Sequence, residues 1–102
     1  MNAYAARNFF LTPAQESAAS VIYRSLQAAE AAIGSGETQA KKIIREITAI
    51  IEPEPLAALE YAVVADPDTL EPLGRIQQSA LIGVGVRIGE TSLNDSLLIE
   101  GR

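Results

Sequence analysis

The side chains with most potential for chemistry are arginines and carboxylates, because the chain has no histidine and no cysteine. Without histidine it lacks the commonest general base and the commonest transition-metal ligand. Without cysteine it has neither a disulfide framework nor a thiolate zinc site. A bound metal would have to be a hard cation such as Mg²⁺, held by carboxylates. We therefore predict no catalytic residue and no metal site from the residue types.

Two short patterns could bind ligands, but each has a simpler structural interpretation. Asp66 and Asp68 have the spacing of two cation ligands, yet segment 66–69 is typical of a capped turn, which we expect to be a short helical one. Gly83 and Gly85 alternate along an apolar strand, whereas a phosphate loop is a glycine-rich turn between a strand and a helix. We expect these glycines to leave a flat strip that another chain or element can approach closely.

The charge balance argues against nucleic acid as a partner. The net charge is −5, from 13 acidic and 8 basic residues, whereas binding to phosphates requires clustered cations. The adjacent pair Lys41 and Lys42 falls in a helical pattern and is interpreted as a solvated helix face. No run of residues has the length of a membrane span. With 48% hydrophobic residues, we expect one folded domain over residues 1–102, without nucleic acid or membrane partners, in the cytoplasm.

Two helices are predicted to follow an N-terminal arm at residues 1–11. Thr12 can cap a helix over 12–34, with Pro13 at its first position and Gln15 completing a capping box. Gly34 is the expected left-handed residue at its end. The apolar stripe of this helix is expected to comprise Ala18, Ile22, Leu26, Ala29 and Ile33.

The second helix is predicted over 37–52. Glu37 lies near its start, where the helix dipole favours a negative charge, and Pro53 follows its end. One face of this helix carries Ala40, Ile43, Ile44, Ile47, Ile50 and Ile51. The two helices are expected to run antiparallel, joined by a short turn.

The periodicity then changes from that of a helix to that of strands. Strands are predicted over 59–65, 80–88 and 91–99, within a sheet region at 56–99, and Gly89-Glu90 forms a hairpin turn between the last two. The first strand is apolar enough to be mostly buried. The predicted fold is therefore an α+β two-layer sandwich, in which two helices cover one face of a three-stranded antiparallel sheet.

Several segments, taken in order, resemble one enzyme family. "RNFFLTPAQ" resembles an "SRN-x-x-L-S-P-E" stretch, and "LEYAVVADPDTLEPL" resembles "Y-V-x-V-V-D-x-x-T-L-E-P". "ALIGVGVRIGETSLNDSLL" is similar to a closing hairpin with the motif "A-A-R-x-G-x-T-R-L-I-D-N". The motifs that these segments resemble are those of the pantothenate synthetase family, the pantoate–β-alanine ligases. The similarity extends from about Ala5 to Leu98 and is specific because several segments agree in order and spacing.

The resemblance implies part of an ATP-dependent ligase of pantothenate biosynthesis. The complete enzyme joins pantoate to β-alanine through a pantoyl-adenylate, with ATP and magnesium as cofactors. Its larger N-terminal domain carries a His-x-Gly-His motif, and this histidine-free sequence matches only the C-terminal domain, which acts as a lid over the nucleotide. We therefore expect the chain to be non-catalytic and without a cofactor in isolation, and to have the N-terminal domain as its partner.

The arm corresponds, by this resemblance, to a loop that holds ATP phosphates. Ala5 and Ala6 stand where the family has two serines, while Arg7 and Asn8 are kept. Two hydroxyl donors are thus lost, and Arg7 remains as the charged donor to phosphate. In the isolated chain, the sequence favours Arg7 as a solvated residue of an N-terminal arm over Arg7 as a phosphate ligand.

Further departures support an alternative function. Glu16 stands where the family commonly has arginine, and Ser92 and Asn94 replace an arginine and an aliphatic residue of the hairpin motif. These changes remove positive charge near the expected ligand side. An engineered or degenerate non-catalytic scaffold, binding a protein partner or itself, is the second hypothesis, and its partner surface would be formed by Tyr4, Phe9 and Phe10.

Overall fold

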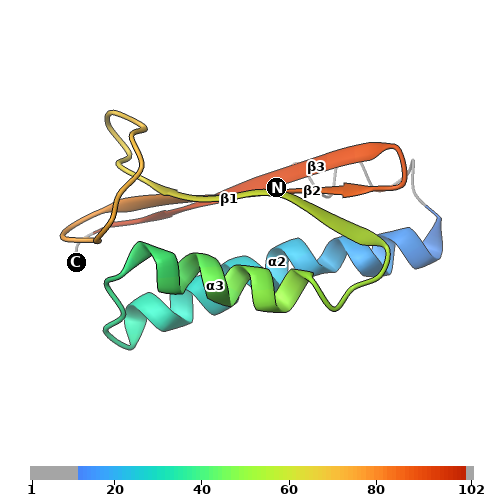
Figure 1. Cartoon of the computed structure of the whole chain (residues 1–102), viewed down its shortest axis with the longest axis horizontal. Coiled ribbons are helices and arrows are strands. Elements are labelled where there is room, and N and C mark those ends of the chain that lie inside the picture. The colour runs from blue at the N-terminus through green and yellow to red at the C-terminus, as the bar shows by residue number, and fades with distance from the viewer. Residues whose placement is uncertain (1–11, 101–102) are drawn as a thin grey trace.

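A computed structural model describes residues 12–100 of the 102-residue chain. Two helices are followed by three strands: α2 (Pro13–Gly34), α3 (Ala40–Ile51), β1 (Ala57–Ala65), β2 (Ala80–Ile88) and β3 (Thr91–Ile99). The strands form one antiparallel sheet in the order β1-β2-β3. Both helices lie against the same face of this sheet (Figure 1). The predicted α+β two-layer sandwich is therefore confirmed.

Helix α2 begins as the sequence predicts and ends slightly differently. The Thr12 hydroxyl accepts a hydrogen bond from the Gln15 amide at 3.1 Å, and the Gln15 side chain accepts one from the Thr12 amide at 3.1 Å. This reciprocal pair is the predicted capping box. At the other end Gly34 is the last helical residue, and Gly36 is the one with positive φ, at 107°. The left-handed turn thus comes after the helix, where only glycine is unstrained.

Helix α3 begins at Ala40 and not at Glu37, where the sequence had placed its start. The Glu37 carboxylate accepts hydrogen bonds from the backbone amides of Thr38 and Gln39, at 3.1 and 3.0 Å. The carbonyl of Thr38 accepts from the amide of Ile76 at 2.8 Å. Residues 37–39 are therefore hydrogen-bonded to the loop before β2 or to the Glu37 side chain, and α3 begins only after them, at Ala40.

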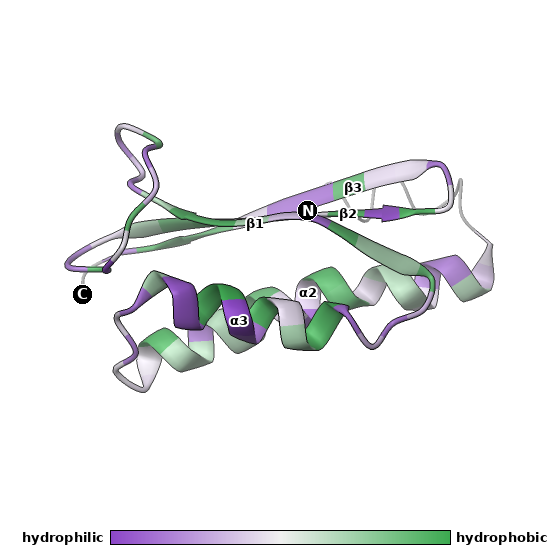
Figure 2. Cartoon of the chain, viewed as in Figure 1, coloured by the Kyte–Doolittle hydropathy of each residue, from purple (hydrophilic) through white to green (hydrophobic). Residues whose placement is uncertain are grey.

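The core lies between the helices and the covered face of the sheet. Helix α3 packs mainly against β1, and α2 packs against β2 and β3. Hydrophobic colours appear on both the helices and the strands (Figure 2), at helical spacing on the helices and at alternate residues of the strands. Helical core residues include Ala18, Ile22, Leu26, Ala29, Ile33, Ala40, Ile43, Ile47 and Ile51, and sheet core residues include Ile82, Val84, Val86, Ile88 and Leu93. The stripe predicted for α2 is confirmed in full, whereas Ile44 and Ile50 of α3 are only half-buried.

Strand β1 is less buried than the sequence predicts. Val64 and Ala65 are its buried residues, whereas Tyr61 and Val63 are 44% and 43% exposed. The expectation of a mostly buried strand is wrong because β1 lies at an edge of the sheet and the helices cover one face only. Alternate residues of an apolar strand then face solvent.

The connection from β1 to β2 begins with the predicted capped turn. The Asp66 carboxylate accepts hydrogen bonds from the amides of Asp68 and Thr69, at 2.8 and 3.0 Å. The segment is a turn and does not form the short helix that we expected. The connection rises on the side of the sheet away from the helices (Figure 1).

The glycines of β2 are covered by side chains of the neighbouring strand β1. Gly85 pairs with Tyr61 across the strands, and a Cβ atom on Gly85 would lie 2.7 Å from Cδ2 and 2.8 Å from Cζ of the Tyr61 ring. A Cβ atom on Gly83 would lie 3.2 Å from Cγ2 of Val63. The close approach that we expected from another chain or element is therefore made by the neighbouring strand β1.

Replacing Ile47 by alanine tests the helix–sheet core. Ile47 is fully buried at the middle of the α3 stripe. We expect Ile47→Ala to lower the free energy of unfolding by about 2 to 5 kcal/mol, through lost burial and a cavity. Urea denaturation is the measurement, and Ile50→Ala, on the half-buried flank of the same helix, is the control with a smaller loss. Equal losses for both variants would contradict this packing.

Replacing Gly85 by alanine tests the contact between β1 and β2. The added methyl group overlaps the Tyr61 ring, so we expect a loss of about 1 to 3 kcal/mol from overpacking. In the double variant Gly85→Ala/Tyr61→Ala the overlap is gone, and the two losses should be clearly less than additive. Thermal unfolding of the four proteins in the cycle measures this, and strictly additive losses would show that the ring does not cover Gly85.

Candidate functional site

The residues that the sequence predicts for ligand and partner contact lie outside the described part of the chain. The predicted phosphate contacts are Ala5, Ala6, Arg7 and Asn8, and the predicted partner surface is Tyr4, Phe9 and Phe10. Their roles stay predictions. The described residues do show where this arm joins the fold, and that junction locates the candidate site.

The arm joins the fold beside the β2–β3 hairpin turn. A Cβ atom on Gly89, at that turn, would lie 2.7 Å from the side-chain nitrogen of Gln15 in the first turn of α2. Gly89 has φ 64°, in the left-handed region, so glycine is favoured there for its backbone as well as for the space. The described part of the candidate site is therefore the start of α2 together with the hairpin.

The hairpin residues that depart from the family motif share one face of the sheet. Strand alternation places Ser92, Asn94 and Ser96 on the face away from the helices, because Leu93 between them is fully buried in the core. Ser92 donates a hydrogen bond to the Glu60 carboxylate at 3.4 Å. The motif, which is continuous in sequence, is thus divided between two faces.

Glu60 also forms an ion pair on this outer face. Its carboxylate lies 3.4 Å from Nε of Arg87, and both side chains are partly exposed to solvent. A pair of this kind contributes little to stability, about 0 to 1 kcal/mol. It makes the outer face polar at the hairpin end of the sheet.

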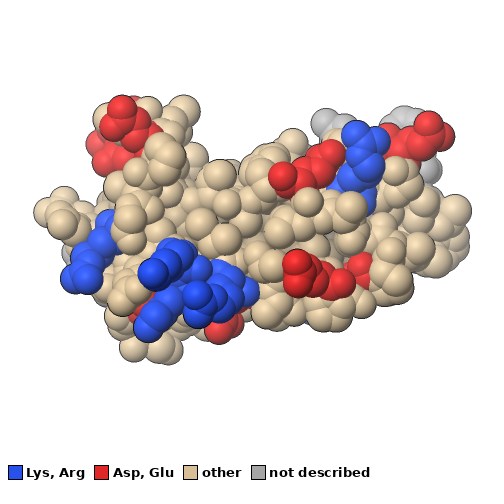
Figure 3. Space-filling view, viewed as in Figure 1, with Lys and Arg blue, Asp and Glu red and all other residues tan. Residues whose placement is uncertain are grey.

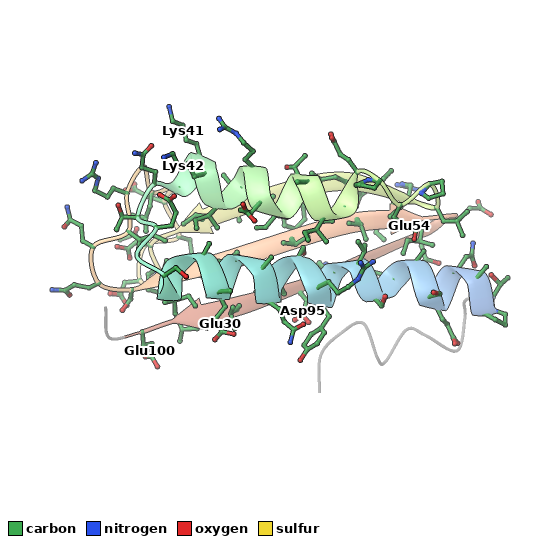
Figure 4. All side chains as sticks on the ribbon, turned by 90° about the horizontal axis from the view of Figure 1, so that it is seen from below. Glu30, Lys41, Lys42, Glu54, Asp95 and Glu100 are labelled. Carbon is green, nitrogen blue, oxygen red and sulfur yellow. The ribbon has the colours of Figure 1, made fainter. Side chains whose placement is uncertain are left out.

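Asp95 is a residue that the sequence analysis did not select. It occupies a core-facing position of β3, where the alternation otherwise places Leu93 and Leu97, and it accepts a hydrogen bond from the Ser96 amide at 2.8 Å. It lines a groove of about 300 Å³ between α2 and β3, together with Tyr23, Leu26, Gln27, Glu30, Ser96 and Leu97. Figure 4 shows Glu30 and Asp95 on these two elements. The sequence signal that could have identified Asp95 is a charged residue at a position of the strand pattern where apolar side chains are expected.

A second hollow, of about 650 Å³, lies at the other end of the sheet. It is lined by Asp66, Pro67, Asp68, Leu73, Arg75, Gln77, Gln78, Ser79, Leu98 and Glu100. The Asp66 carboxylate accepts the two turn hydrogen bonds already described. Within residues 12–100, no group of three or more carboxylates is arranged to hold a metal ion.

Charge is distributed unevenly over the surface. Basic side chains gather over the first turns of α3, where Lys41, Lys42 and Arg45 are exposed, and acidic residues are prominent on the raised connection after β1 (Figure 3). Exposure of Lys41 and Lys42 confirms the solvated helix face. The 22 residues of α2 separate this basic surface from the start of α2 by roughly 33 Å. No described helix is long and apolar enough to cross a membrane.

The fold and the site define an α+β domain in which the start of α2 meets a polar β2–β3 hairpin at one end. The chain belongs to the pantoate-beta-alanine ligase family, whose model matches residues 2–98. It is 41% identical over 98 residues to the pantothenate synthetase of Herpetosiphon aurantiacus, covering 95% of this chain and 36% of that protein. It is also 35% identical to the bifunctional pantoate ligase/cytidylate kinase of Synechococcus elongatus, covering 98% of this chain and 19% of that one.

A solved structure agrees with this assignment. The crystal structure of pantothenate synthetase from Thermus thermophilus superposes with a TM-score of 0.82 at 30% identity, covering 89% of this chain and 33% of that one. The chain thus spans about a third of the length of such synthetases. This confirms the resemblance to the C-terminal domain that the sequence segments indicated.

Removing the helix cap tests the junction of arm and fold. We expect Thr12→Ala to lower the free energy of unfolding by about 1 kcal/mol, because the Gln15 amide loses its acceptor. Gln15→Ala removes the reciprocal bond to the Thr12 amide and should cost a similar or smaller amount. Calorimetric unfolding measures both, and an unchanged midpoint for Thr12→Ala would mean that the Thr12 side chain does not stabilise the start of α2.

Proposed function

We propose that this chain is the C-terminal lid of an ATP-dependent ligase that joins pantoate to β-alanine in pantothenate biosynthesis, and that it is not catalytic alone. The observation that carries the proposal is the family match over nearly the whole chain, combined with coverage of only about a third of the relatives. The nucleotide-binding part of the ligase is then its functional partner. ATP and magnesium are cofactors of the complete enzyme.

Within this proposal the arm contributes to holding the triphosphate. Arg7 donates charge-assisted hydrogen bonds to phosphate oxygens, Asn8 adds a side-chain amide, and Ala5 and Ala6 offer backbone amides. The start of α2, which follows the arm in the sequence, lies beside the Gly89 turn, so in this proposal the hairpin is near the nucleotide when the lid is closed. The chemical role of these residues is to position the phosphates and to balance charge at the adenylation step.

The chain alone offers little to a nucleotide. Its net charge is −5, and its basic surface on α3 is distant from the arm. Base and ribose contacts belong, in this proposal, to the other part of the ligase. We therefore propose that the isolated chain binds ATP no tighter than roughly the millimolar range, equivalent to about 4 kcal/mol of binding free energy.

A chimeric ligase tests the function. The part of the Herpetosiphon aurantiacus synthetase that precedes its matched segment is joined to this chain, and pantothenate formation from pantoate, β-alanine and ATP is measured. We expect the chimera to be active and the isolated chain to be inactive. The same join, rebuilt with the relative's own C-terminal segment, is the control for the fusion. An inactive chimera beside an active control would overturn the proposal and favour the scaffold hypothesis.

The role of Arg7 is tested in the same chimera. Arg7→Ala should lower kcat/KM for ATP by about 10- to 150-fold, which corresponds to roughly 1.5 to 3 kcal/mol for a hydrogen bond to a charged group. The matched control is Arg24→Ala, which removes an exposed arginine of α2 and should leave the rate unchanged. Equal rates for both variants would show that Arg7 is only a solvated residue.

A further inference from the structure

The two edges of the sheet differ in how they are protected from further strand pairing. At the β1 edge the register shifts between Leu59 and Tyr61, and Glu60, which lies at the shift, pairs with Arg87. At the β3 edge the register with β2 is unbroken over residues 91–99, and the strand has no lysine, arginine or proline. Bulges, lysines and prolines are common devices that block an exposed edge. In the described part of the chain, the β3 edge is therefore the more accessible to another strand.

One hydrogen bond shows which backbone groups of β3 face outward. The Ser96 amide donates to the Asp95 carboxylate at 2.8 Å, which places this amide on the side away from β2. Backbone groups of alternate residues in an antiparallel strand point to opposite sides, so those of Asn94 and Leu98 face the open edge as well. Within residues 12–100, no backbone hydrogen bond from a turn or loop reaches these two residues. Their N–H and C=O groups are then available to a fourth strand.

The groove between α2 and β3 borders this edge, since three consecutive residues of β3 line it. Leu26, which is 6% exposed, and the half-buried Leu97 form its apolar part, and Tyr23 adds an aromatic ring. Glu30 and Asp95 supply its charges. No lysine or arginine of the described chain forms an ion pair with either carboxylate. The groove thus combines apolar walls with two carboxylates that have no cationic partner among the described residues.

The shape and charge of the groove suit one long basic side chain. The basic surface of α3 does not serve it, because Figure 4 shows Lys41 and Lys42 on the opposite flank of the helix layer from Glu30 and Asp95. A lysine or arginine packs its aliphatic stem on apolar surface and keeps its charged head at the rim. A cation held over the Tyr23 ring gains a further attraction.

We propose that the β3 edge and this groove together bind an extended, basic segment of another protein. The segment adds to the sheet as a fourth strand and places a lysine or arginine side chain against Glu30 and Asp95. Strand addition takes its affinity from main-chain hydrogen bonds and its specificity from pockets for alternate side chains. The inference does not depend on the proposed ligase function, because every residue that carries it lies in the described fold.

Charge selects the class of partner. The groove is acidic and the chain has a net charge of −5, so a basic segment is attracted and an acidic one is repelled. A charge that points inward from an edge strand opposes pairing with an apolar or acidic strand. Pairing of β3 with β3 of a second copy would bring two Asp95 carboxylates to one seam, and like charges across a strand pair are destabilising. A basic segment is the occupant that neutralises Asp95.

Binding of synthetic peptides to the full chain tests the inference. The probe is a fluorescently labelled peptide as long as β3, with alternating arginine and threonine, and fluorescence anisotropy measures its dissociation constant. One comparison peptide carries N-methyl groups throughout its backbone, which prevents strand pairing and keeps the charge. The other has glutamate in place of arginine. We expect the probe to bind at least ~10-fold tighter than either comparison peptide.

Paired charge variants locate the cation. Glu30→Gln/Asp95→Asn removes both groove charges, while an amide oxygen still accepts from the Ser96 amide, and should weaken binding of the probe by at least ~10-fold. The control is Glu46→Gln/Glu52→Gln, which makes the same change of net charge at exposed residues on and next to α3. It should leave the affinity within about 2-fold, because distant surface charges are screened. Thermal unfolding checks the fold of both variants, and Glu30→Gln alone replaces the groove pair if that pair unfolds.

Amide hydrogen exchange locates the added strand. An excess of the probe should slow exchange of the outward amides of Asn94 and Leu98 by at least ~10-fold, whereas Tyr61, at the other edge of the sheet, keeps its rate. Protection of β1 in place of β3 would overturn the inference. Tight binding of the N-methylated peptide would show charge attraction without strand addition and would overturn it as well.

Three further results would contradict the proposed partner. The first is no binding of the probe at millimolar concentration, and the second is an equal loss of affinity in the groove and control variants. The third comes from light scattering of the chain alone. A dimer that Asp95→Lys converts to a monomer would assign the β3 edge to a second copy of this chain.

Discussion

The structure depends on packing two helices against one face of a three-stranded sheet. Helix α3 packs mainly against β1, and α2 packs against β2 and β3. Ile43, Ile47 and Ile51 of α3 and alternate side chains of β2 from Ile82 to Ile88 are fully buried in the resulting core. Apolar burial of this kind is the main favourable term in folding. Because both helices pack on the same face of the sheet, they leave its other face uncovered. The exposed side chains on β1 follow directly from this one-sided arrangement.

The sequence predicted what depends on local pattern. The capping box of Thr12 and Gln15, the stripe of α2 and the strand periods are local features, and the structure confirms them. The two errors with the largest effect on the fold concern long-range partners. Helix α3 starts late because Thr38 is bonded to Ile76, and β1 is exposed because it is an edge strand. Neither partner is visible in a window of neighbouring residues.

The candidate site was predictable to a lesser degree. The arm was selected through family resemblance, and the family match over residues 2–98 supports that resemblance, while the individual roles of Arg7 and Asn8 stay predictions. Asp95 was missed because its interest comes from facing α2 across a groove, which requires the register of β3. The glycines of β2 were noticed, but their partner Tyr61 could be assigned only from strand pairing.

The open face of the sheet differs in character from the covered one. Gly83 and Gly85 of β2 lie beneath Val63 and Tyr61 of β1, so close packing between the strands continues on the side that the helices leave uncovered. Toward the hairpin, the same face carries Ser92 and Asn94 and the ion pair of Glu60 and Arg87. Polar and charged side chains thus keep the hairpin end of the open face hydrated, whereas Val63 and Leu98, 43% and 48% exposed, lie toward its other end. One sheet therefore combines a dry face, fixed by the helices, with an outer face whose character changes along the strands.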